Sequence, residues 1–338
     1  MIINLNLGER SYDIVIERGV LKKAKELLNL ERKVLVVTDS GVPKEYAEGI
    51  AAQCKVGFIV TLAQGEESKN LENFKKLLHE MLQNDFTRTD CVAAVGGGVV
   101  GDLAGFAAAS YMRGIDFYNL PTTVLSQIDS SIGGKVAVDF EGVKNVIGAF
   151  YQPQKVLIDP DVLKTLAPRQ FSNGLAEAIK MSLTSDKELF ELFETKDIAS
   201  NIEEIIVRSL NIKKQVVETD EREKGLRKIL NFGHTLGHGI ETGAEEAGLF
   251  HGECVALGML PMCEKATRAR LVKVLKKANL PTTVKINPEK VFAAARHDKK
   301  FSGRNVTIVK VKEPGSFVLE KIPEEKLLDL IKEIGVEA

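Results

Sequence analysis

The sequence contains no tryptophan, and aromatic residues make up only 6% of its 338 positions. A surface that stacks sugars or bases on aromatic rings is therefore not expected. The chain also lacks an excess of charge, because 46 basic residues face 47 acidic ones and the formal net charge is −1. This balance disfavours a strongly basic nucleic-acid binder and an acidic disordered chain, so no nucleic-acid partner is expected.

Cysteines and long apolar runs are also scarce. The four cysteines, at positions 54, 91, 254 and 263, form no CxxC pair, which predicts buried free thiols in a reducing compartment. The longest stretch of low charge, residues 91–111, contains Asp102 and many small residues, unlike a membrane span. The first residues alternate like a strand and lack a signal-peptide pattern. We therefore expect a cytoplasmic protein without membrane contact.

The length and the order of predicted elements indicate two domains. A single core rarely exceeds roughly 250–300 residues, and this chain has 338. Residues 1–159 alternate between predicted strands (2–7, 12–16, 33–38, 56–62, 91–95) and predicted helices (20–29, 43–53, 69–83). This alternation predicts an open α/β sheet, in which ligands lie at the carboxyl ends of the strands.

Residues 160–338 have a mostly helical periodicity. Helical patterns cover residues 161–219, 227–247, 251–268 and 323–334, and a strand pair is predicted at 305–311 and 316–321. The expected fold class is thus an α/β domain, 1–159, followed by a mostly α-helical domain, 160–338.

The segment GGGVVGD, residues 96–102, follows a predicted buried strand and begins a helix. Gly96, Gly98 and Gly101 satisfy G-x-G-x-x-G, and without side chains the backbone N–H groups can approach a pyrophosphate. The alternative is a tight strand-to-helix turn. The late position of the motif in the domain argues against a standard dinucleotide-binding unit.

A second glycine-rich segment, DSSIGGK at residues 129–135, resembles a phosphate loop. It is not a Walker A motif, because Asp129 stands where glycine is required and Val136 replaces Ser or Thr, so ATP hydrolysis is not expected. Lys135 and the pair Lys144–Asn145 are candidates for anion binding. Ordinary surface lysines are the alternative.

Histidine gives the sharpest signal, because three of the five histidines lie between positions 234 and 251. His234 and His238 are four apart on a predicted helix and project from one face, and His251 begins the next helix. Imidazoles that converge from adjacent helices suit a divalent metal such as zinc. Glu177 is a candidate carboxylate ligand, since an acid among Leu, Ala and Ile is costly to bury without a charged partner. Lys180 shares its helix face.

The charged segment DEREKGLR, residues 220–227, is most simply a solvated loop. Its place just before the histidine cluster makes Arg227 and Asn231 candidates for substrate contact.

The motifs together resemble one family. GGGVVGD, PTTVLSQIDSSIGGK, GVKNVIGAFYQP, LKTL, GLAEAIK, DEREKGLR, LNFGHTLGH and HGECVALGM occur in the order typical of 3-dehydroquinate synthases of the shikimate pathway. The resemblance implies a Rossmann-like NAD-binding domain, a helical domain that holds zinc or cobalt, and a homodimer. It implies conversion of 3-deoxy-D-arabino-heptulosonate 7-phosphate to 3-dehydroquinate and phosphate, with NAD regenerated in each cycle.

The resemblance also assigns roles to residues. The metal ligands match Glu177, His234 and His251, whereas spacing alone pairs His234 with His238, which the family pattern places beside the substrate. The substrate-contacting positions match Arg113 (reaching from the partner subunit), Asp129, Lys135, Asn145, Lys180, Lys213, Arg227, Asn231, His238 and one of Lys299 and Lys300. The NAD-contacting positions match Asp39, Glu66, Lys69, Gly98, Val99, Val100, Gly101, Asp102, Thr122, Thr123, Lys135, Lys144, Val162, Leu163, Lys164 and Thr165.

Two positions depart from the family pattern, both on the NAD side. Gly41 stands where Asn is frequent, and Gln64 replaces the first acid of a D-G-E segment. Three alternatives stay open: another sugar phosphate cyclase whose substrate lacks the carboxylate, a metal-dependent alcohol or glycerol dehydrogenase, and a non-catalytic NAD- or metal-sensing module.

Overall fold

The computed structural model describes residues 1–223, 225–296, 301–302 and 305–334. Lys299 and Lys300 lie outside these residues. The chain divides into two compact units, Met1–Ala167 and Pro168–Ala338. The division falls after the expected boundary at 159, because the short helix η6 (Pro160–Thr165) is tied to the first unit. Asp161 pairs with Arg18 at 2.7 Å, and the Thr165 hydroxyl lies 3.0 Å from that of Tyr46.

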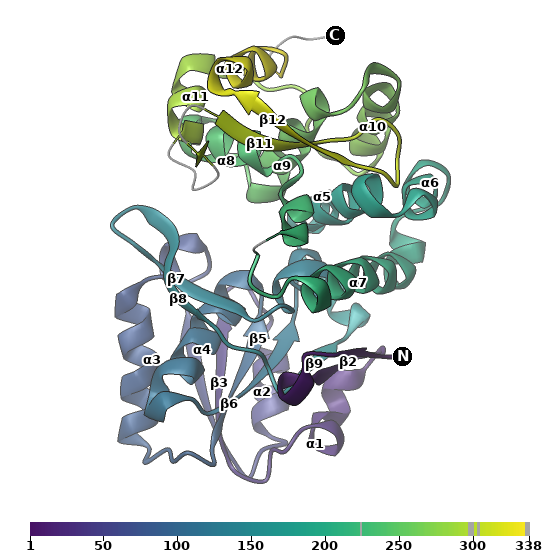
Figure 1. Cartoon of the computed structure of the whole chain (residues 1–338). Coiled ribbons are helices and arrows are strands. Elements are labelled where there is room, and N and C mark those ends of the chain that lie inside the picture. Colours follow the sequence, from purple (N-terminus) through teal and green to yellow (C-terminus); the bar gives the residue numbers. More distant parts are fainter. Residues whose placement is uncertain (224, 297–300, 303–304, 335–338) are drawn as a thin grey trace. The chain divides into compact units, whose positions relative to one another are not determined.

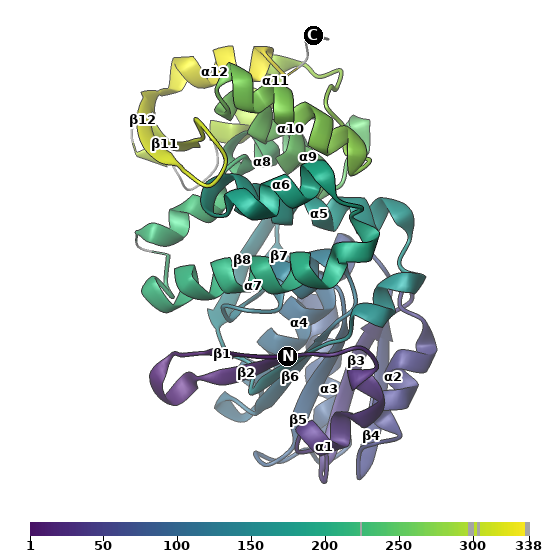
Figure 2. The same cartoon turned by 90° about the vertical axis from the view of Figure 1, so that its right-hand side faces the viewer.

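The first unit is built on a seven-stranded sheet in the order β1-β2-β9-β6-β5-β3-β4 (Figure 1). Every neighbouring pair is parallel except the hairpin of β1 and β2, which lies at the sheet edge and carries the N-terminus (Figure 2). The strands are β1 (Ile2–Leu5), β2 (Tyr12–Ile16), β3 (Lys33–Asp39), β4 (Val56–Leu62), β5 (Cys91–Gly96), β6 (Asp116–Pro121) and β9 (Lys155–Ile158).

Helices cover both faces of this sheet, namely α1 (Ala24–Leu27) and α2 (Lys44–Ala51) on one face, and α3 (Leu71–Gln83) and α4 (Gly98–Ser110) on the other. Strand β3 shows why both faces are apolar. Val34 and Val36 pack toward α1 and α2, and Leu35 and Val37 pack toward α3 and α4, as the alternation along a strand requires. The predicted open α/β sheet is therefore confirmed, and helices cover both of its faces.

A separate hairpin of β7 (Lys135–Phe140) and β8 (Val143–Phe150) follows the second glycine-rich segment. Gly133 and Gly134 both have positive φ, 93° and 65°, so the turn into β7 needs residues without a Cβ atom. Sequence patterns predict neither this hairpin nor β6 and β9. The predicted helix at 20–29 is only a 3-10 turn followed by α1.

The second unit is mostly helical. Its helices are α5 (Pro168–Ser185), α6 (Lys187–Thr195), α7 (Ile202–Thr219), α8 (His234–Gly243), α9 (His251–Met259), α10 (Lys265–Lys277), α11 (Pro288–Arg296) and α12 (Glu324–Lys332). A small antiparallel sheet joins β10 (Phe301–Ser302), β11 (Asn305–Lys310) and β12 (Val318–Pro323). The mostly helical character expected for this half is confirmed.

Two predicted helices of the second unit are wrong as continuous elements. The predicted helix at 227–247 is broken into η8 (Leu226–Asn231) and α8, because Gly233 has φ 76° and a Cβ there would clash with Met259. The predicted helix at 251–268 ends at Met259, since Pro261 follows at the start of a 3-10 turn.

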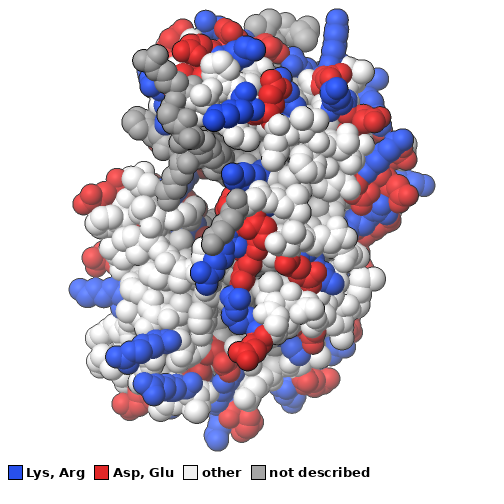
Figure 3. All heavy atoms as spheres, viewed as in Figure 1, with Lys and Arg blue, Asp and Glu red and all other residues white. Residues whose placement is uncertain are grey.

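The distribution of charge on the surface and the hydropathy of the helices both agree with the amino-acid composition. Basic and acidic side chains are interspersed on the face drawn in Figure 3, in keeping with the net charge of −1. Among the described residues, no helix combines the length and the hydropathy needed to cross a membrane.

Candidate functional site

The carboxyl ends of the parallel strands gather several of the predicted residues at one edge of the first unit. Asp39 is the last residue of β3, and Gly97 follows the last residue of β5, its neighbour in the sheet. Strand β4 lies on one side of β3, and the next strand of this sheet along the chain, β5, lies on the other side. The strand order therefore reverses beside β3. Ligands of open α/β sheets bind outside such a switch point.

Helix α4 begins at Gly98, directly after β5, as predicted for the GGGVVGD segment. Gly97 is its N-cap and offers no side chain, which leaves the first turn to backbone N–H groups, the arrangement that suits an anion. Packing also demands glycine here, because a Cβ on Gly96 would clash with Val100 and one on Gly101 would lie 3.1 Å from the Asn119 amide. Both explanations of the glycine-rich motif, access of a phosphate to the backbone and a tight strand-to-helix turn, thus have a physical basis.

A hollow of about 520 Å³ lies beside Asp39, lined by residues 38–44, the α2 residues Ala47 and Glu48, and Ile59 and Thr61 of β4. Asp39 accepts a hydrogen bond from the Gly41 N–H at 2.8 Å. Burial raises the pKa of this carboxyl, opposed by hydrogen bonds from the backbone of Gly41 and Val42. The two departures from the family pattern meet here, because a Cβ on Gly41 would clash with the Gln64 side chain.

The buried Lys69 is the centre of a polar network in the first unit. Its ammonium group lies 2.7 Å from Asp102, 3.6 Å from Glu66 and 2.5 Å from the Asn145 side-chain oxygen. Burial alone would lower the pKa of Lys69, but the two carboxylates outweigh it and the net shift is upward. Asn145 has φ 55°, and its N–H donates to Asp139 at 2.7 Å. Three predicted NAD residues and one predicted phosphate residue are thus brought together.

The remaining predicted residues of the first unit lie on turns and strand ends. Val100, Val162 and Leu163 have buried side chains, so they could meet a nucleotide only through their backbone. Thr122 and Thr123 follow β6, Asp129 lies in a π-helical turn (Ser126–Ser130), and Arg113 has φ 70°. Exposed positions are Arg113, Lys135, Lys144, Asn145, Lys164 and Thr165.

The second unit buries an ion pair inside α5. Every residue from 172 to 184 is buried, and within this stretch Glu177 and Lys180 are each 1% exposed. The Lys180 ammonium group pairs with Glu177 Oε2. Such a charge inside an apolar helix is tolerated only with a charged partner. Among the described residues, nothing donates a hydrogen bond to the other oxygen, Oε1, although it is buried.

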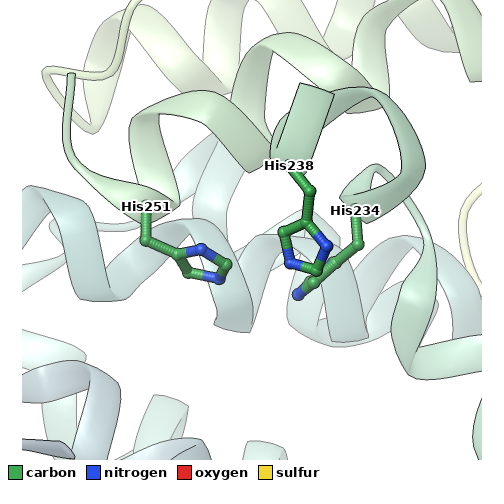
Figure 4. Close-up of side chains that lie close together, drawn as sticks. All are labelled: His234, His238 and His251. Carbon is green, nitrogen blue, oxygen red and sulfur yellow. The ribbon is translucent and has the colours of Figure 1, made fainter. Parts of the chain in front are cut away.

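Three imidazoles converge beside this carboxylate. His234 and His238 project from α8 and His251 from the start of α9, and their rings point into a common space (Figure 4). Each offers one ligand nitrogen, and these atoms lie within 4.8 Å of one another. The ring centroids are 5.3 to 5.7 Å apart. The predicted clustering of the three histidines is therefore confirmed.

The distances around Glu177 match a tetrahedral metal ion. Glu177 Oε1 lies 3.4 Å from His234 Nε2 and 3.6 Å from His251 Nε2, both beyond ordinary hydrogen-bond distance. Two ligands of a tetrahedral zinc ion are separated by about 3.4 Å, given bond lengths of about 2.1 Å. An orphaned buried carboxylate oxygen at this separation from two imidazole nitrogens fits a divalent cation.

The second ring nitrogens of two histidines have partners of their own. His234 Nδ1 lies 3.2 Å from the Phe232 carbonyl oxygen, and His251 Nδ1 lies 3.1 Å from Glu241 Oε2. Such contacts favour a proton on Nδ1 and leave Nε2 to face Glu177. Sequence reasoning missed Glu241. Its position seven residues after His234 and three after His238, on one helix face, was the available signal.

Close helix packing brings these groups together. A Cβ on Gly258 of α9 would clash with the Gly233 carbonyl oxygen, and one on Gly252 with that of Asn173 in α5. The Gly252 N–H donates to the Asn173 side chain at 2.6 Å. Glycines therefore let α8 and α5 approach the two sides of α9, and the motifs LNFGHTLGH and HGECVALGM combine ligands with packing.

The electrostatics of the cluster depend on its pairings. Burial opposes ionisation of Glu177, but Lys180 and His251 outweigh it and lower the carboxyl pKa to about 2. Burial likewise opposes protonation of His251, but Glu177 and Glu241 outweigh it and raise the imidazole pKa to about 9. The cluster therefore attracts positive charge.

Lys213, Arg227 and Asn231 lie on other elements of the second unit. Lys213 is buried in α7, and Arg227 is buried in η8, where its guanidinium donates to the Glu221 carbonyl oxygen. The Asn231 amide donates to Glu223 at 3.1 Å. A role of these residues in substrate binding remains a prediction.

The fold and the site define a class of protein with an α/β nucleotide-type unit and a helical unit bearing a carboxylate–histidine cluster. Solved structures of this fold include a 2-deoxy-scyllo-inosose synthase complexed with carbaglucose-6-phosphate, NAD+ and Co2+ (TM-score 0.88, 26% identity, 99% of this chain and 100% of that chain). A 2-epi-5-epi-valiolone synthase from Streptomyces hygroscopicus with NAD+ and Zn2+ is similar (TM-score 0.87, 27% identity, 97% and 98%). A probable glycerol dehydrogenase from Sinorhizobium meliloti shares the fold at TM-score 0.62 and 17% identity, over 95% of each chain.

Sequence comparison narrows this class to one family. The models for the N-terminal and C-terminal parts of 3-dehydroquinate synthase match residues 59–173 and 174–301. The 3-dehydroquinate synthases of Enterococcus faecalis and Clostridium acetobutylicum are 40% and 41% identical to this chain. These matches cover 99% and 96% of this chain, and 99% and 97% of those proteins. The chain belongs to the 3-dehydroquinate synthase family, which confirms the resemblance seen in the motifs.

Proposed function

We propose that the chain converts 3-deoxy-D-arabino-heptulosonate 7-phosphate to 3-dehydroquinate and phosphate. The observation that carries this proposal is the buried Glu177 oxygen, 3.4 and 3.6 Å from two histidine nitrogens, in a chain of this family. NAD and a divalent cation, zinc or cobalt, are the proposed cofactors. The named structural neighbours that hold NAD+ with Co2+ or Zn2+ support both.

Glu177, His234 and His251 would hold the metal ion. When bound, the ion polarises hydroxyl and carbonyl oxygens of the substrate and makes the hydroxyl that is oxidised more acidic. Lys180 keeps Glu177 ionised and holds its Oε2, so that Oε1 is presented in a fixed direction. His238 is proposed to face the substrate, as the family resemblance implies. Its ring centroid lies 5.3 Å from that of His234 and 5.7 Å from that of His251, so it lines the same space.

The first unit would hold NAD at the carboxyl edge of its sheet. Bound NAD would supply a reversible hydride acceptor for the substrate. The first turn of α4 would approach the pyrophosphate through backbone N–H groups, and Asp39 would accept hydrogen bonds from a ribose. Glu66, Lys69 and Asp102 form one network, so they would act on the nucleotide together.

The substrate has a phosphate at one end and a carboxylate at the other. Lys135, Asn145 and Lys180, with Arg113 from a partner subunit, are proposed for the phosphate, because cationic and amide donors form charge-assisted hydrogen bonds with it. Lys213, Arg227, Asn231 and Asp129 are proposed for the carboxylate and hydroxyl groups. A homodimer in the cytoplasm, with no nucleic acid or membrane partner, completes the proposal.

A cyclase whose substrate lacks the carboxylate is the second candidate, favoured by the likeness to 2-deoxy-scyllo-inosose synthase. Arg227 separates the two, because a guanidinium meets a carboxylate with two parallel hydrogen bonds that lysine does not reproduce. We expect Arg227→Lys to lower kcat/KM for the heptulosonate phosphate by roughly 30- to 3000-fold, from about 2–5 kcal/mol for a desolvated charged pair. An effect within about threefold would show that the carboxylate is held elsewhere, with Lys299 and Lys300 the next candidates.

The direct experiment incubates the purified protein with the heptulosonate phosphate, NAD and zinc, and measures phosphate, 3-dehydroquinate and NADH together. We expect phosphate and product in equal amounts, dependence on NAD, and no accumulation of NADH. Stoichiometric NADH would favour an ordinary dehydrogenase. Absence of any turnover with zinc bound would favour the sensing module.

A further inference from the structure

The carboxylate of Glu241 lies at the edge of the histidine cluster. Its Oε2 is 3.1 Å from His251 Nδ1, and its side chain is 16% exposed. Glu241 follows His234 and His238 on the same face of α8, while its partner His251 begins α9. The contact therefore joins the two helices that carry the three imidazoles.

An imidazole ring can rotate and can carry its proton on either nitrogen. A carboxylate on Nδ1 fixes both choices, because it accepts the Nδ1–H bond and turns the Nε2 lone pair the opposite way. For His251 the opposite side is Glu177 Oε1, 3.6 Å from Nε2. The His251 ring thus lies between two carboxylates. Glu177 would bind the metal ion together with His251, and Glu241 would only orient the ring.

His234 has a different orienting group. Its Nδ1 faces the Phe232 carbonyl oxygen at 3.2 Å, which fixes the ring but carries no net charge. Glu241 supplies a full negative charge from a mostly buried position, where electrostatic interactions are stronger than in water. A charged orienting group raises the basicity of the imidazole and strengthens its bond to a cation.

We propose that Glu241 is a positioning residue of the metal site, which holds His251 with Nε2 toward the metal and strengthens its binding. The proposal rests on the proposed function in one respect, namely that Glu177, His234 and His251 bind a divalent cation. It adds a residue that none of the sequence motifs singled out.

The test measures the zinc affinity of the full-length protein by competition with a chromophoric chelator. We expect Glu241→Ala to weaken zinc binding about 10- to 100-fold, the range for loss of a group that orients a metal ligand. Glu241→Gln should weaken it less, because its amide oxygen can still accept the Nδ1–H bond. Glu245→Gln is the matched control, an exposed acid just beyond the same helix, and should bind zinc like the wild type.

Two further measurements separate positioning from a general structural role. The visible spectrum of the Co2+-loaded protein reports ligand geometry, and we expect it to change in Glu241→Ala and to be largely restored in Glu241→Gln. Thermal unfolding of the metal-free variants should stay close to that of the wild type. Equal spectra in all variants, with affinity following thermal stability, would overturn the positioning role.

The outcomes for the two proposals differ. If His251→Ala binds zinc as tightly as the wild type, the proposed metal site is wrong. If His251→Ala loses zinc but Glu241→Ala stays within about threefold of the wild type, below the 10-fold lower bound, only the role of Glu241 is wrong.

Discussion

The two units present their candidate groups in opposite ways. In the first unit they lie where parallel strands end, so the topology of the sheet brings Asp39 and the start of α4 to one edge. In the second unit, Glu177 and the histidines project from helices and not from the edge of a sheet. These side chains are positioned instead by close helix packing at glycines and by the pairing of buried charges. A site on a sheet edge follows from the fold class, whereas a site between helices depends on individual residues.

The two buried lysines sharpen this contrast. Lys69 is 5% exposed, but its partners Asp102 and Glu66 have side chains 19% and 43% exposed, so water reaches that network. Lys180 and Glu177 are both 1% exposed, so both members of this pair are buried. Removing a lysine therefore leaves a solvated carboxylate in one unit and a buried one in the other.

We expect Lys180→Met to destabilise the metal-free protein by about 3–5 kcal/mol, because it leaves the Glu177 charge buried without its partner. Lys69→Met should cost about 1–3 kcal/mol, the range for a polar group that loses its hydrogen bond. Urea unfolding in the presence of a chelator measures both. Zinc should stabilise Lys180→Met more than the wild type, because a cation at Glu177 replaces the lost charge. If zinc stabilises both proteins equally, Glu177 is not a ligand.

The histidine cluster allows a matched comparison inside the second unit. We expect His251→Ala to weaken zinc binding by more than about 100-fold, beyond the range for loss of an orienting group. His238→Ala should stay within about 10-fold, since His238 is assigned to the substrate side. Zinc content after dialysis and competition with a chelator measure both. Equal losses would restore the pairing of His234 with His238 that spacing alone favours.

Individual glycines differ in how closely their neighbours approach them. A Cβ on Gly252 would clash with the Asn173 carbonyl oxygen, so we expect Gly252→Ala to cost about 1–3 kcal/mol and to shift the neighbouring His251. Gly49 in α2 has nothing within 4 Å of its Cβ position, so Gly49→Ala should stabilise the protein by about 0.4–1 kcal/mol. Unfolding and zinc titrations of both variants check this. Gly252→Ala with normal stability and zinc affinity would contradict the close approach of α5 and α9.

Sequence patterns predicted those parts of the fold that rest on local periodicity. The apolar runs of β3 and β5 and the alternation of strands and helices gave the α/β class correctly. Strand β6 was missed because its Asp116 and Asn119 interrupt the apolar pattern, and β9 because it has only four residues. The break at Gly233 was missed because the helical period continues across it. The close approach of Met259, which leaves no room for a Cβ atom at position 233, is a tertiary feature that no local pattern reports.

The candidate site likewise contains residues that local spacing predicts and residues that only the tertiary structure brings together. Spacing brought the three histidines together, but Glu241 escaped notice because its partner His251 lies on the next helix. The contact between Lys69 and Asn145 joins residues 76 positions apart, and no local pattern reports such a distance. The apolar surroundings of Glu177 already made it a candidate ligand, whereas the role expected for Lys69 came from the resemblance to the family. The structure added the groups that contact both residues.

The smallest expected effect concerns a pair that lies apart from the histidine cluster, at the start of α6. Asp186 is the N-cap of α6 and accepts a hydrogen bond from the Leu189 N–H at 3.0 Å. Arg208 donates two hydrogen bonds to the same carboxylate, each at 2.8 Å. Burial would raise the pKa of Asp186, but Arg208 and the helix N-terminus outweigh it, so the pKa is lowered.

A lowered carboxyl pKa in the folded state stabilises the protein above the unfolded value of about 4, and this contribution is lost as the pH falls through the folded pKa. We expect Asp186→Ala to cost about 1–2 kcal/mol at pH 7, from the lost cap and a partly exposed ion pair. Asp186→Asn keeps the cap acceptor and should cost less than 1 kcal/mol, roughly the value of the ion pair. Glu188→Gln removes a second carboxylate on Arg208, one that is 79% exposed, and should change stability by less than about 0.5 kcal/mol. Urea unfolding at pH 7 and near pH 3 tests the sign, because the cost of Asp186→Asn should shrink at the lower pH. A cost that stays constant or grows on acidification would show that the charge of Asp186 does not stabilise this unit.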